Sequence, residues 1–437
     1  MITSIDARGR VLSAAQLSAL LPRPAMDVEQ ASVAAATLIA EVRAEGSAAL
    51  LRHAERFDGV RPTAIRVSAA ELAAAERALD PEVRAALLGA IERVRRASEA
   101  QVPATRETVF SAGQRVIQRW QPVDRVGLYV PGGKAVYPSS VIMNAVPAQV
   151  AGVRSLALAS PAQSSHGGGV HPTILAAAAL LGIDEVYAMG GASAIGAFAY
   201  GVDDMALAAV DVVTGPGNIF VAAAKRLVRA QVGIDAEAGT TEILIIADSA
   251  ANPRFIAADL LSQAEHDEAA ASVLVTDSAE LADAVRTELE RLVAGTEHSE
   301  RARTALSGPQ SAIVLVDDLA DAARVSNAYG PEHLEIQTRD DDAVLAAITS
   351  AGAIFLGAYS PVSLGDYMAG SNHVLPTGGQ ARFSSGLGAY SFLRPQQIIA
   401  YDRPGLADVR DGIVALSHAE HLPAHGDAVL ERFIETE

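Results

Sequence analysis

A series of short runs of apolar and β-branched residues constrains the fold of this 437-residue chain more than any other feature. Each run is mostly apolar rather than alternating, so both faces of the strand that it predicts must be covered. Helical, often alanine-rich stretches separate the runs, as parallel strands require. The runs form two groups, at residues 126–130, 155–159, 185–189 and 211–214, and at residues 242–247, 272–276, 312–316 and 353–356. The pattern predicts an α/β protein with two parallel halves.

The segments outside these runs differ in character. Residues 27–101 carry apolar positions at helical spacing, and Asp80 followed by Pro81 is typical of a helix start. Residues 357–390 are rich in Gly, Ser and Pro without a period, and loops of that length are usually functional or disordered. The tail from residue 395 to 437 is too short for a core of its own, so we expect it to pack on something else, with a partner subunit as one candidate.

Composition excludes several classes of protein. The 34 basic and 52 acidic residues give a formal charge of −18, which disfavours nucleic acid and anionic membranes as partners. The absence of cysteine excludes disulfides, thiolate catalysis and iron–sulfur clusters, so any zinc must be held by His, carboxylate or amide groups. The charged start does not resemble a signal peptide, and the longest apolar run, residues 174–183, is too short to span a bilayer. We therefore expect a cytoplasmic protein.

Three glycine-rich turns follow predicted strands. The first, Gly-Leu-Tyr-Val-Pro-Gly-Gly-Lys134, does not match the triphosphate-binding pattern, because Ala135 replaces the hydroxyl that would bind magnesium. The second, Thr-Gly-Pro-Gly-Asn218, precedes a helical run whose free N–H groups could cradle an anion, although Phe220 breaks the dinucleotide fingerprint. The third spans residues 190–196. On local sequence alone, the first turn could equally be a tight turn that needs glycine, and the second turn is by itself a weak signal.

A second set of residues has the chemistry of metal ligands. Gln263 and His266 are three residues apart at the end of a helix that Asn252 starts, so both could face one ion, although such a pair alone is more typical of solvated surface. Neutral imidazole, carboxylate and amide oxygen are acceptable zinc donors. Further donors of these kinds are Asp366 and His373 in the long loop and Glu420 and His425 in the tail. We interpret the nearby His418 and His421 as surface residues.

Glu332 and His333 adjoin in a turn that leads into an alternation of apolar residues. A histidine can accept a proton near neutral pH and a carboxylate can polarise water, which are the tasks of an acid–base site. The alternative is a capped turn with a structural histidine, and local sequence slightly favours that alternative.

Taken together, these motifs resemble histidinol dehydrogenase. Five of them occur in the order and rough spacing of that family: Gly-Leu-Tyr-Val-Pro-Gly-Gly, Gly-Pro-Gly-Asn, Ser-Gln-Ala-Glu-His-Asp, Gly-Pro-Glu-His-Leu and Ser-Asn-His-Val-Leu-Pro-Thr. The resemblance runs from about residue 39 to the tail. It implies four-electron oxidation of L-histidinol through bound histidinal to L-histidine, the final steps of histidine biosynthesis, with one zinc ion per subunit and two NAD⁺. It also implies an intertwined homodimer, each chain having two incomplete Rossmann-like domains and small terminal domains.

The resemblance also assigns roles to residues. The implied zinc ligands, which also line the substrate site, are Gln263, His266, Asp366 and, from the partner subunit, His425. Further substrate contacts are Thr241, His333, His373 and Glu420, and the NAD contacts are Tyr129, Ser193 and Asn218. Ser193 stands where the family commonly has Gln, and Thr241 where it commonly has Ser. His333 would act as the base in both oxidations, and Glu332 would activate the water that hydrates the aldehyde.

We expect the domains to divide the chain as follows: an N-terminal segment at 1–25, a first Rossmann-like domain at 26–125 plus 242–385, a second on the NAD side at 126–241, and a dimerisation tail at 386–437. Two rival functions remain at this point. A zinc-dependent hydrolase could use the same ligands to activate water without NAD. A binding protein of the periplasmic type would also have two α/β lobes, although the missing signal sequence disfavours it.

Overall fold

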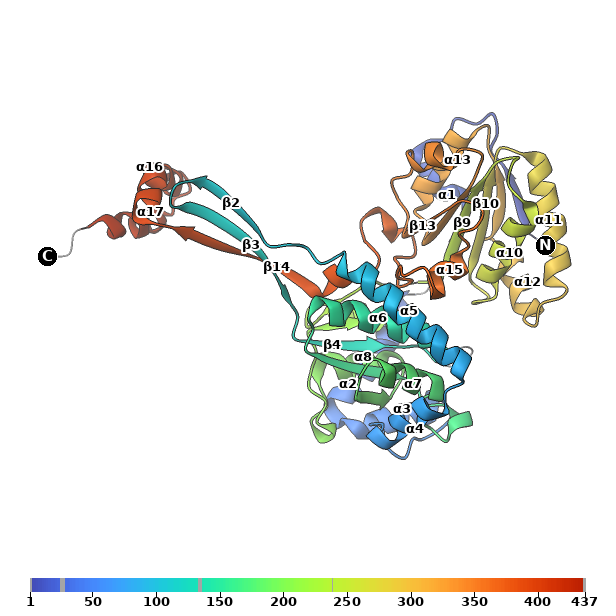
Figure 1. Ribbon diagram of the computed structural model, residues 1–437, viewed down its shortest axis with the longest axis horizontal. Coiled ribbons are helices and arrows are strands. Elements are labelled where there is room, and N and C mark those ends of the chain that lie inside the picture. The colour runs from blue at the N-terminus through green and yellow to red at the C-terminus, as the bar shows by residue number, and fades with distance from the viewer. Residues whose placement is uncertain (1, 24–27, 133–135, 238, 435–437) are drawn as a thin grey trace. The chain divides into compact units, whose positions relative to one another are not determined.

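The computed structural model describes residues 2–23, 28–132, 136–237 and 239–434 (Figure 1). The chain divides into two units, one made of Met1–Gln101 and Val123–Phe392 and the other of Val102–Pro122 and Leu393–Glu437. The first unit contains two parallel sheets, which confirms the predicted α/β class with two Rossmann-like halves. None of the helices in the described part of the chain is long and apolar enough to cross a bilayer.

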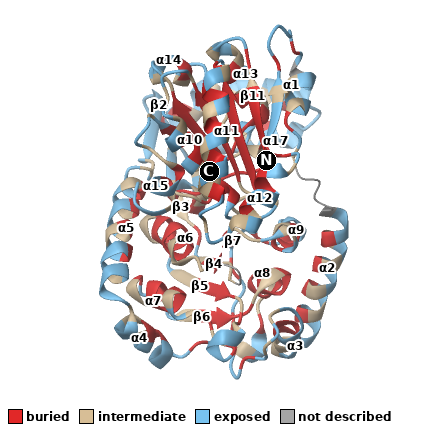
Figure 2. Ribbon diagram, turned by 90° about the vertical axis from the view of Figure 1, so that its right-hand side faces the viewer, coloured by how far each residue is buried: buried red, intermediate tan, exposed pale blue. Residues whose placement is uncertain are grey.

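One sheet of the first unit has six parallel strands in the order β1-β11-β10-β9-β12-β13. The strands are β1 (Thr3–Asp6), β9 (Glu242–Ala247), β10 (Ala271–Thr276), β11 (Ala312–Leu315), β12 (His333–Gln337) and β13 (Ala353–Leu356). Without β1, the order is that of five strands of a doubly wound Rossmann sheet, with the switch point between β9 and β12. Figure 2 shows its strands as a buried layer behind α10 and α11.

Helices cover both faces of the six-stranded sheet. They are α1 (Ala14–Leu20), α10 (Pro253–Ala264), α11 (Ala279–Val293), α12 (Ser299–Ser307), α13 (Leu319–Tyr329), α14 (Asp341–Leu345) and α15 (Val362–Tyr367). Successive residues of a strand point to opposite faces. Ile243 of β9 therefore joins the apolar core with Leu260 of α10, whereas Leu244 joins the core with Val325 of α13. This two-sided burial explains why β9 is apolar from residue 243 to residue 247.

The other sheet has five parallel strands in the order β6-β5-β4-β7-β8, again a Rossmann order, with its switch point between β4 and β7. Its strands are β4 (Arg125–Tyr129), β5 (Ser155–Ser160), β6 (Glu185–Ala188), β7 (Val212–Thr214) and β8 (Gly233–Ile234). The helices between them are α6 (Pro138–Ala151), α7 (Pro172–Leu180), α8 (Gly191–Tyr200) and α9 (Ile219–Val228).

The helical leading section comprises α2 (Val28–Glu45), α3 (Ser47–Phe57), α4 (Ala69–Ala78) and α5 (Pro81–Glu99). Our expected boundaries grouped it with residues 242–385, but α2 contacts α8 and α9, α4 contacts α7, and α5 contacts α6. The cause is a shared apolar core in which Ile39 and Val42 are buried with Phe198. The N-terminal segment, in contrast, supplies β1 to the edge of the six-stranded sheet, where it pairs with β11.

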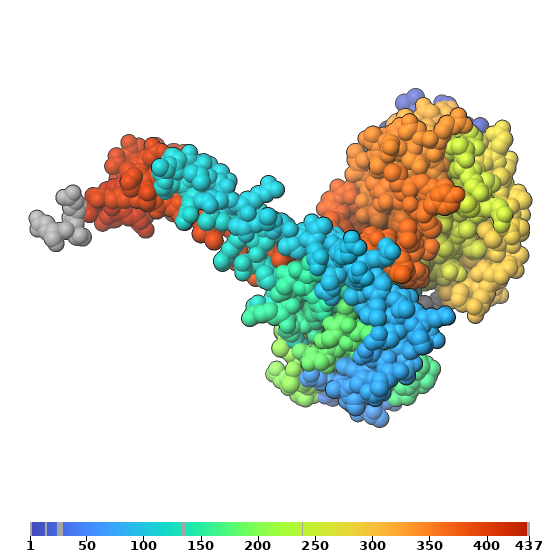
Figure 3. Space-filling view, viewed as in Figure 1, coloured from blue at the N-terminus to red at the C-terminus, as the bar shows by residue number. Residues whose placement is uncertain are grey.

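The second unit joins two distant segments. Strands β2 (Arg106–Ser111), β3 (Gln114–Pro122) and β14 (Leu393–Tyr401) form an antiparallel sheet, followed by α16 (Arg403–Ala419) and α17 (Pro423–Leu430). Within this unit, the strands are open to solvent along much of their length, while the helices pack at one end (Figure 3). The tail thus pairs with residues 102–122, which we had grouped with a Rossmann-like domain.

Candidate active site

A hydrogen-bonded cluster lies at the amino ends of β9 and β12. The two strands are neighbours, and His333 pairs with Ile243 in register, so Thr241 and Glu332 meet just before them. Glu332 Oε2 accepts hydrogen bonds from Thr241 Oγ1 at 2.6 Å and from the Glu242 N–H at 2.9 Å. Burial raises the pKa of Glu332, while the nearby His333 opposes that shift. A buried carboxyl with a raised pKa is suited to proton transfer near neutral pH.

His333 is buried, and its hydrogen bond indicates which ring nitrogen carries the proton. Its Nδ1 lies 3.1 Å from the backbone oxygen of Glu242. Because a carbonyl oxygen can only accept, Nδ1 carries the proton and Nε2 of the neutral ring keeps its lone pair. The ring is 5 % exposed and tilts against Phe355. The structure therefore orients His333 with a free basic nitrogen, which favours the acid–base interpretation over a simple capped turn.

Gln263 and His266 approach this cluster from α10. The helix runs antiparallel to the strands, so its carboxyl end returns to their amino ends. Asn252 caps its start as expected. Gln263 Nε2 donates to Thr241 Oγ1 at 2.7 Å, which leaves the amide oxygen free to accept elsewhere. Burial lowers the pKa of His266, and the charges of Asp366 and His333 also act on it. His266 is therefore favoured as a neutral imidazole, the form that binds metal ions.

Asp366 and His373 come from the long loop between β13 and β14. Asp366 lies in the short helix α15, and His373 donates from Nδ1 to the Asp366 backbone oxygen at 3.1 Å. His373 Nε2 is 3.3 Å from Ser140 Oγ of α6. Burial lowers the pKa of His373, and His266 and His333 act on the same ring. The loop that lacked any sequence period thus brings two predicted site residues to the cluster.

The donor groups of these residues decide whether they suit a zinc ion. Within the described ranges, no three His, Asp or Glu side chains are grouped so that they alone could hold a metal ion. The expected set does not require three, since one chain would give His266, Asp366 and the amide of Gln263, and the partner would give His425. His425 and Glu420 lie in the second unit, exposed in α17 and at the end of α16 respectively. The donor types in the first unit therefore fit a zinc site that is shared with a partner subunit.

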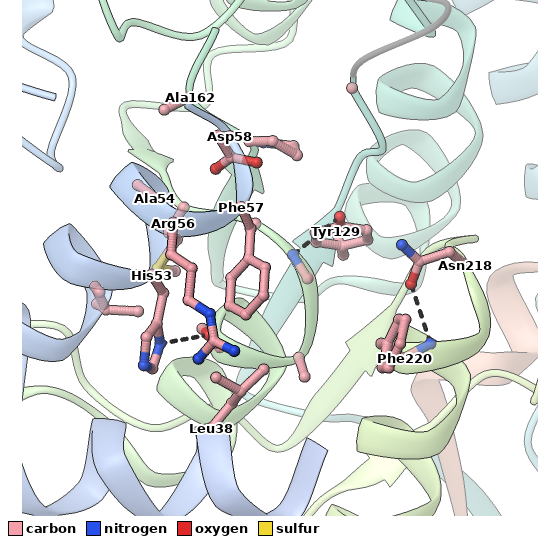
Figure 4. A pocket seen from close by; sticks show the side chains of 18 of the residues that line it. Leu38, His53, Ala54, Arg56, Phe57, Asp58, Tyr129, Ala162, Asn218 and Phe220 are labelled. Atoms are coloured by element: carbon pink, nitrogen blue, oxygen red, sulfur yellow. Dashed lines mark hydrogen bonds between the residues drawn. The ribbon is translucent and has the colours of Figure 1, made fainter. Parts of the chain in front are cut away.

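The glycine-rich turns border a separate pocket of about 860 Å³. Tyr129, at the end of β4, accepts a hydrogen bond from the Gly191 N–H at 3.2 Å, and burial raises the pKa of Tyr129 to about 12. Ser193 lies in the first turn of α8, and Asn218 caps α9 by accepting from the N–H groups of Phe220 and Val221. Figure 4 shows Tyr129 and Asn218 on one side of the pocket. The three predicted NAD contacts therefore share one pocket at a Rossmann switch point.

A buried ion pair supports the turn before Asn218. Lys225, 1 % exposed, pairs with Asp235 and donates to the Gly215 backbone oxygen at 3.0 Å, while Asp235 accepts from the Gly215 N–H at 2.8 Å. Gly215 has φ +117°, and a Cβ there would collide with the Tyr129 carbonyl oxygen. Glycine is required at this position. Lys134 and Ala135 of the first turn lie outside the described residues.

Sequence reasoning missed the titratable side chains that line the pocket besides Tyr129, namely Glu41, His53, Arg56 and Asp58. They come from α2, α3 and the residue that ends α3, and burial raises the pKa of Asp58 to about 6. No motif marks these residues, because they reach the pocket only through the packing of the leading helices against α8. The apolar periodicity of α2 could have predicted that packing but not its partner.

Two Rossmann-type sheets, a pocket at a switch point and a buried acid–base pair define an α/β enzyme. Comparison with known proteins shows to which family of enzymes the chain belongs. A family model described as histidinol dehydrogenase matches residues 21–433. Curated histidinol dehydrogenases from Leifsonia xyli subsp. xyli and Mycolicibacterium smegmatis are 66 % and 57 % identical, covering 99 % of this chain and 99 % and 98 % of their own lengths. A crystal structure of histidinol dehydrogenase from Elizabethkingia anophelis has a TM-score of 0.92 and 33 % identity, covering 99 % of this chain and 98 % of its own.

The chain belongs to the histidinol dehydrogenase family. It is therefore an oxidoreductase. This class excludes the hydrolase and the binding protein that the sequence alone had left open.

Proposed function

We propose that this oxidoreductase acts on histidinol in histidine biosynthesis and carries out the whole four-electron oxidation of L-histidinol to L-histidine, with zinc and two NAD⁺. The observation that carries the proposal is the cluster in which Glu332, Thr241 and Gln263 form one hydrogen-bonded row beside His333. A cytoplasmic location stays a prediction.

The substrate and metal would occupy one site. Gln263, His266 and Asp366 of one chain, with the partner subunit's His425, would hold zinc, and Thr241, His373 and Glu420 would contact histidinol. When bound, zinc supplies a redox-inert Lewis acid that orients the amino alcohol, and NAD⁺ accepts hydride. The neutral state that burial favours in His266 and His373 supports both roles, since neither ring then needs to lose a proton.

His333 and Glu332 would divide the proton transfers. His333 Nε2 accepts the hydroxyl proton of histidinol as hydride leaves, giving histidinal and NADH. Glu332, whose raised pKa makes its carboxylate a better base, takes a proton from the water that adds to the aldehyde. The resulting gem-diol is a second alcohol, from which His333 would again accept the hydroxyl proton in the second oxidation. One site thus serves both steps.

The proposed NAD⁺ pocket is the cavity lined by Tyr129, Ser193 and Asn218. Its place at the carboxyl ends of β4 and β7 supports this assignment, since nucleotides bind at switch points of such sheets. The α6 segment follows the first glycine turn of the pocket, and its Ser140 reaches His373 of the cluster. The pocket and the cluster are therefore joined by one continuous segment of chain.

The second unit supports a homodimer. Large apolar side chains remain exposed on its strands and helices, among them Val109, Phe110, Ile399 and Leu416. Surfaces of this kind usually bind another protein. We propose that a second copy of this chain covers them and that each tail brings His425 and Glu420 to the site of the other subunit.

The function is tested by following absorbance at 340 nm with limiting histidinol and excess NAD⁺. We expect two NADH per histidinol and no accumulation of free histidinal. A yield of one NADH with free aldehyde would contradict the four-electron assignment. Removal of metal by a chelator should abolish NADH formation, and added zinc should restore it, whereas full activity of verified metal-free protein would contradict the role of zinc.

A further inference from the structure

A row of three hydrogen-bonded side chains lies along the wall of the pocket, and two of them, Glu41 and His53, have no role in the function proposed above. Glu41 comes from α2, His53 from α3 and Ser193 from α8. His53 Nε2 lies 2.6 Å from Glu41 Oε2, and His53 Nδ1 lies 2.8 Å from Ser193 Oγ. His53 is 4 % and Ser193 3 % exposed, while the Glu41 side chain is more open. In Figure 4, His53 lies across the pocket from Tyr129 and Asn218.

The partners in the row constrain where its protons lie. The hydrogen bond from His53 holds the pKa of Glu41 below its usual range, so Glu41 is a carboxylate that can only accept. His53 Nε2 must therefore carry a proton and donate it to Glu41. When His53 is a neutral imidazole, its Nδ1 has only a lone pair and accepts the Ser193 hydroxyl proton. In that form of the row, Ser193 Oγ has lone pairs, and no proton, left for a ligand.

This polarity matters because it decides what Ser193 can offer to a ligand. A freely rotating Ser hydroxyl can act as either a donor or an acceptor. A Ser whose proton is already committed offers an acceptor alone, in a fixed direction. Such preorganisation lowers the cost of ordering the site when a ligand binds.

We propose that Glu41 and His53 are positioning residues that hold Ser193 Oγ as a hydrogen-bond acceptor for a donor group of bound NAD⁺, a ribose hydroxyl or the carboxamide NH₂. The inference rests on the proposed assignment of this pocket to NAD⁺. His53 and Glu41 act through Ser193 rather than on the reacting carbon. They should therefore govern NAD⁺ affinity and leave the affinity for histidinol unchanged.

A double-mutant cycle on the zinc-loaded full chain tests the inference. Ser193→Ala and His53→Phe should each weaken NAD⁺ binding by about three- to tenfold, as expected for one oriented hydrogen bond. The double variant should bind NAD⁺ no more weakly than Ser193→Ala, because His53 acts only through the serine. The KM for histidinol should not change. Multiplying effects, or normal NAD⁺ binding by His53→Phe, would overturn the inference.

Glu41 offers a milder test, since its exposed side chain can be changed without disturbing the core. Glu41→Ala should weaken NAD⁺ binding, and Glu41→Gln, whose amide oxygen still accepts from His53, should largely restore it. Glu45 is the matched control, because it also bonds Arg52 but not His53. Glu45→Ala should bind NAD⁺ normally. An equal effect of Glu41→Ala and Glu45→Ala would overturn the inference, because it would trace the loss to Arg52.

A pocket-filling variant separates failure of this inference from failure of the proposed function. Ala34 of α2 lines the same pocket, and Ala34→Trp would occupy part of it. If Ala34→Trp loses NAD⁺ affinity while the Glu41 and His53 variants do not, only the inference fails. If Ala34→Trp folds and binds NAD⁺ normally, the pocket does not hold NAD⁺ and both assignments fail.

Discussion

At the scale of single residues, Glu332 contacts more of the site than any other side chain described above. It accepts from Thr241 and from the Glu242 N–H, and its Oε2 lies 3.5 Å from His333 Nδ1. Its adjacency to His333 was visible in the sequence, but the residues it meets were not. They depend on the pairing of β12 with β9, which brings together positions 90 residues apart. The adjacency of Glu332 and His333 was therefore predictable, whereas their hydrogen-bonded surroundings were not.

Replacing Glu332 by Gln should separate the two oxidations. The amide keeps the size of the side chain but cannot accept a proton, so hydration of the bound aldehyde loses its base. We expect oxidation of added histidinal to slow by about 10²- to 10⁴-fold, the usual contribution of a general base. The first hydride transfer, measured as a single-turnover NADH burst from histidinol, should slow much less. Equal rates of histidinal oxidation in the variant and the parent enzyme would exclude this division of roles.

At the scale of elements, the strands buried on both faces were the most predictable part of the fold. The run at 242–247 coincides with β9, and the run at 272–276 lies within β10. Strands β2, β3 and β14 were not predicted, because their exposed residues mix polar and apolar types without the continuous apolar run of a buried strand. The glycine turns were visible, but their common pocket depends on the order β6-β5-β4-β7-β8, which local sequence does not encode.

Asn218 caps helix α9 and is also a proposed NAD⁺ contact, and two variants separate these two roles. Asn218→Ala removes the acceptor that caps α9 and should lower the free energy of unfolding by about 1 kcal/mol. Asn218→Ser keeps a capping oxygen and should retain most of that stability. Both variants lack the amide NH₂ and should raise the KM for NAD⁺. Chemical denaturation and steady-state kinetics give the two readings, and a normal KM in Asn218→Ser would remove Asn218 from the NAD⁺ site.

Two neighbouring carboxyl groups, those of Asp259 in α10 and Glu335 in β12, should make the free energy of unfolding depend on pH. Burial raises the pKa of Asp259 to about 6 and raises that of Glu335 well above its usual value. Acids with raised pKa values in the folded state stabilise it at low pH, and that contribution is lost as pH rises through the folded pKa. The free energy of unfolding should therefore decline from about pH 4 through pH 6 and above.

Glu335→Gln removes one acid of this pair and should flatten that decline. Glu290→Gln, an exposed change on α11, serves as the control and should leave the profile as it is. Urea unfolding at pH 5 and pH 8 measures the difference. An equal fall in stability for the parent and Glu335→Gln would show that the pair does not cause it.

At the scale of the whole molecule, the site residues are divided between two units of the chain. The first unit brings Gln263, His266 and Asp366 towards the acid–base pair, while Glu420 and His425 remain in the second. The sequence indicated a dependent tail because that segment is too short for a core. It could not indicate that the tail would pair with residues 102–122, since those strands have little apolar periodicity.

The most direct test of the account is complementation between two inactive variants. His266→Ala should lose activity because the first unit of that chain lacks a zinc ligand. His425→Ala should lose activity because its tail no longer supplies a zinc ligand to the partner's site. When the two variants are co-expressed and purified together, random pairing should restore about one quarter of all sites, since about half of the dimers are heterodimers and one of the two sites in each is intact. His418→Ala, a change in the same unit, should be active alone. Recovery of zinc and NADH formation to that fraction is the predicted result, and mixed dimers as inactive and metal-poor as either parent variant would contradict a site shared between subunits.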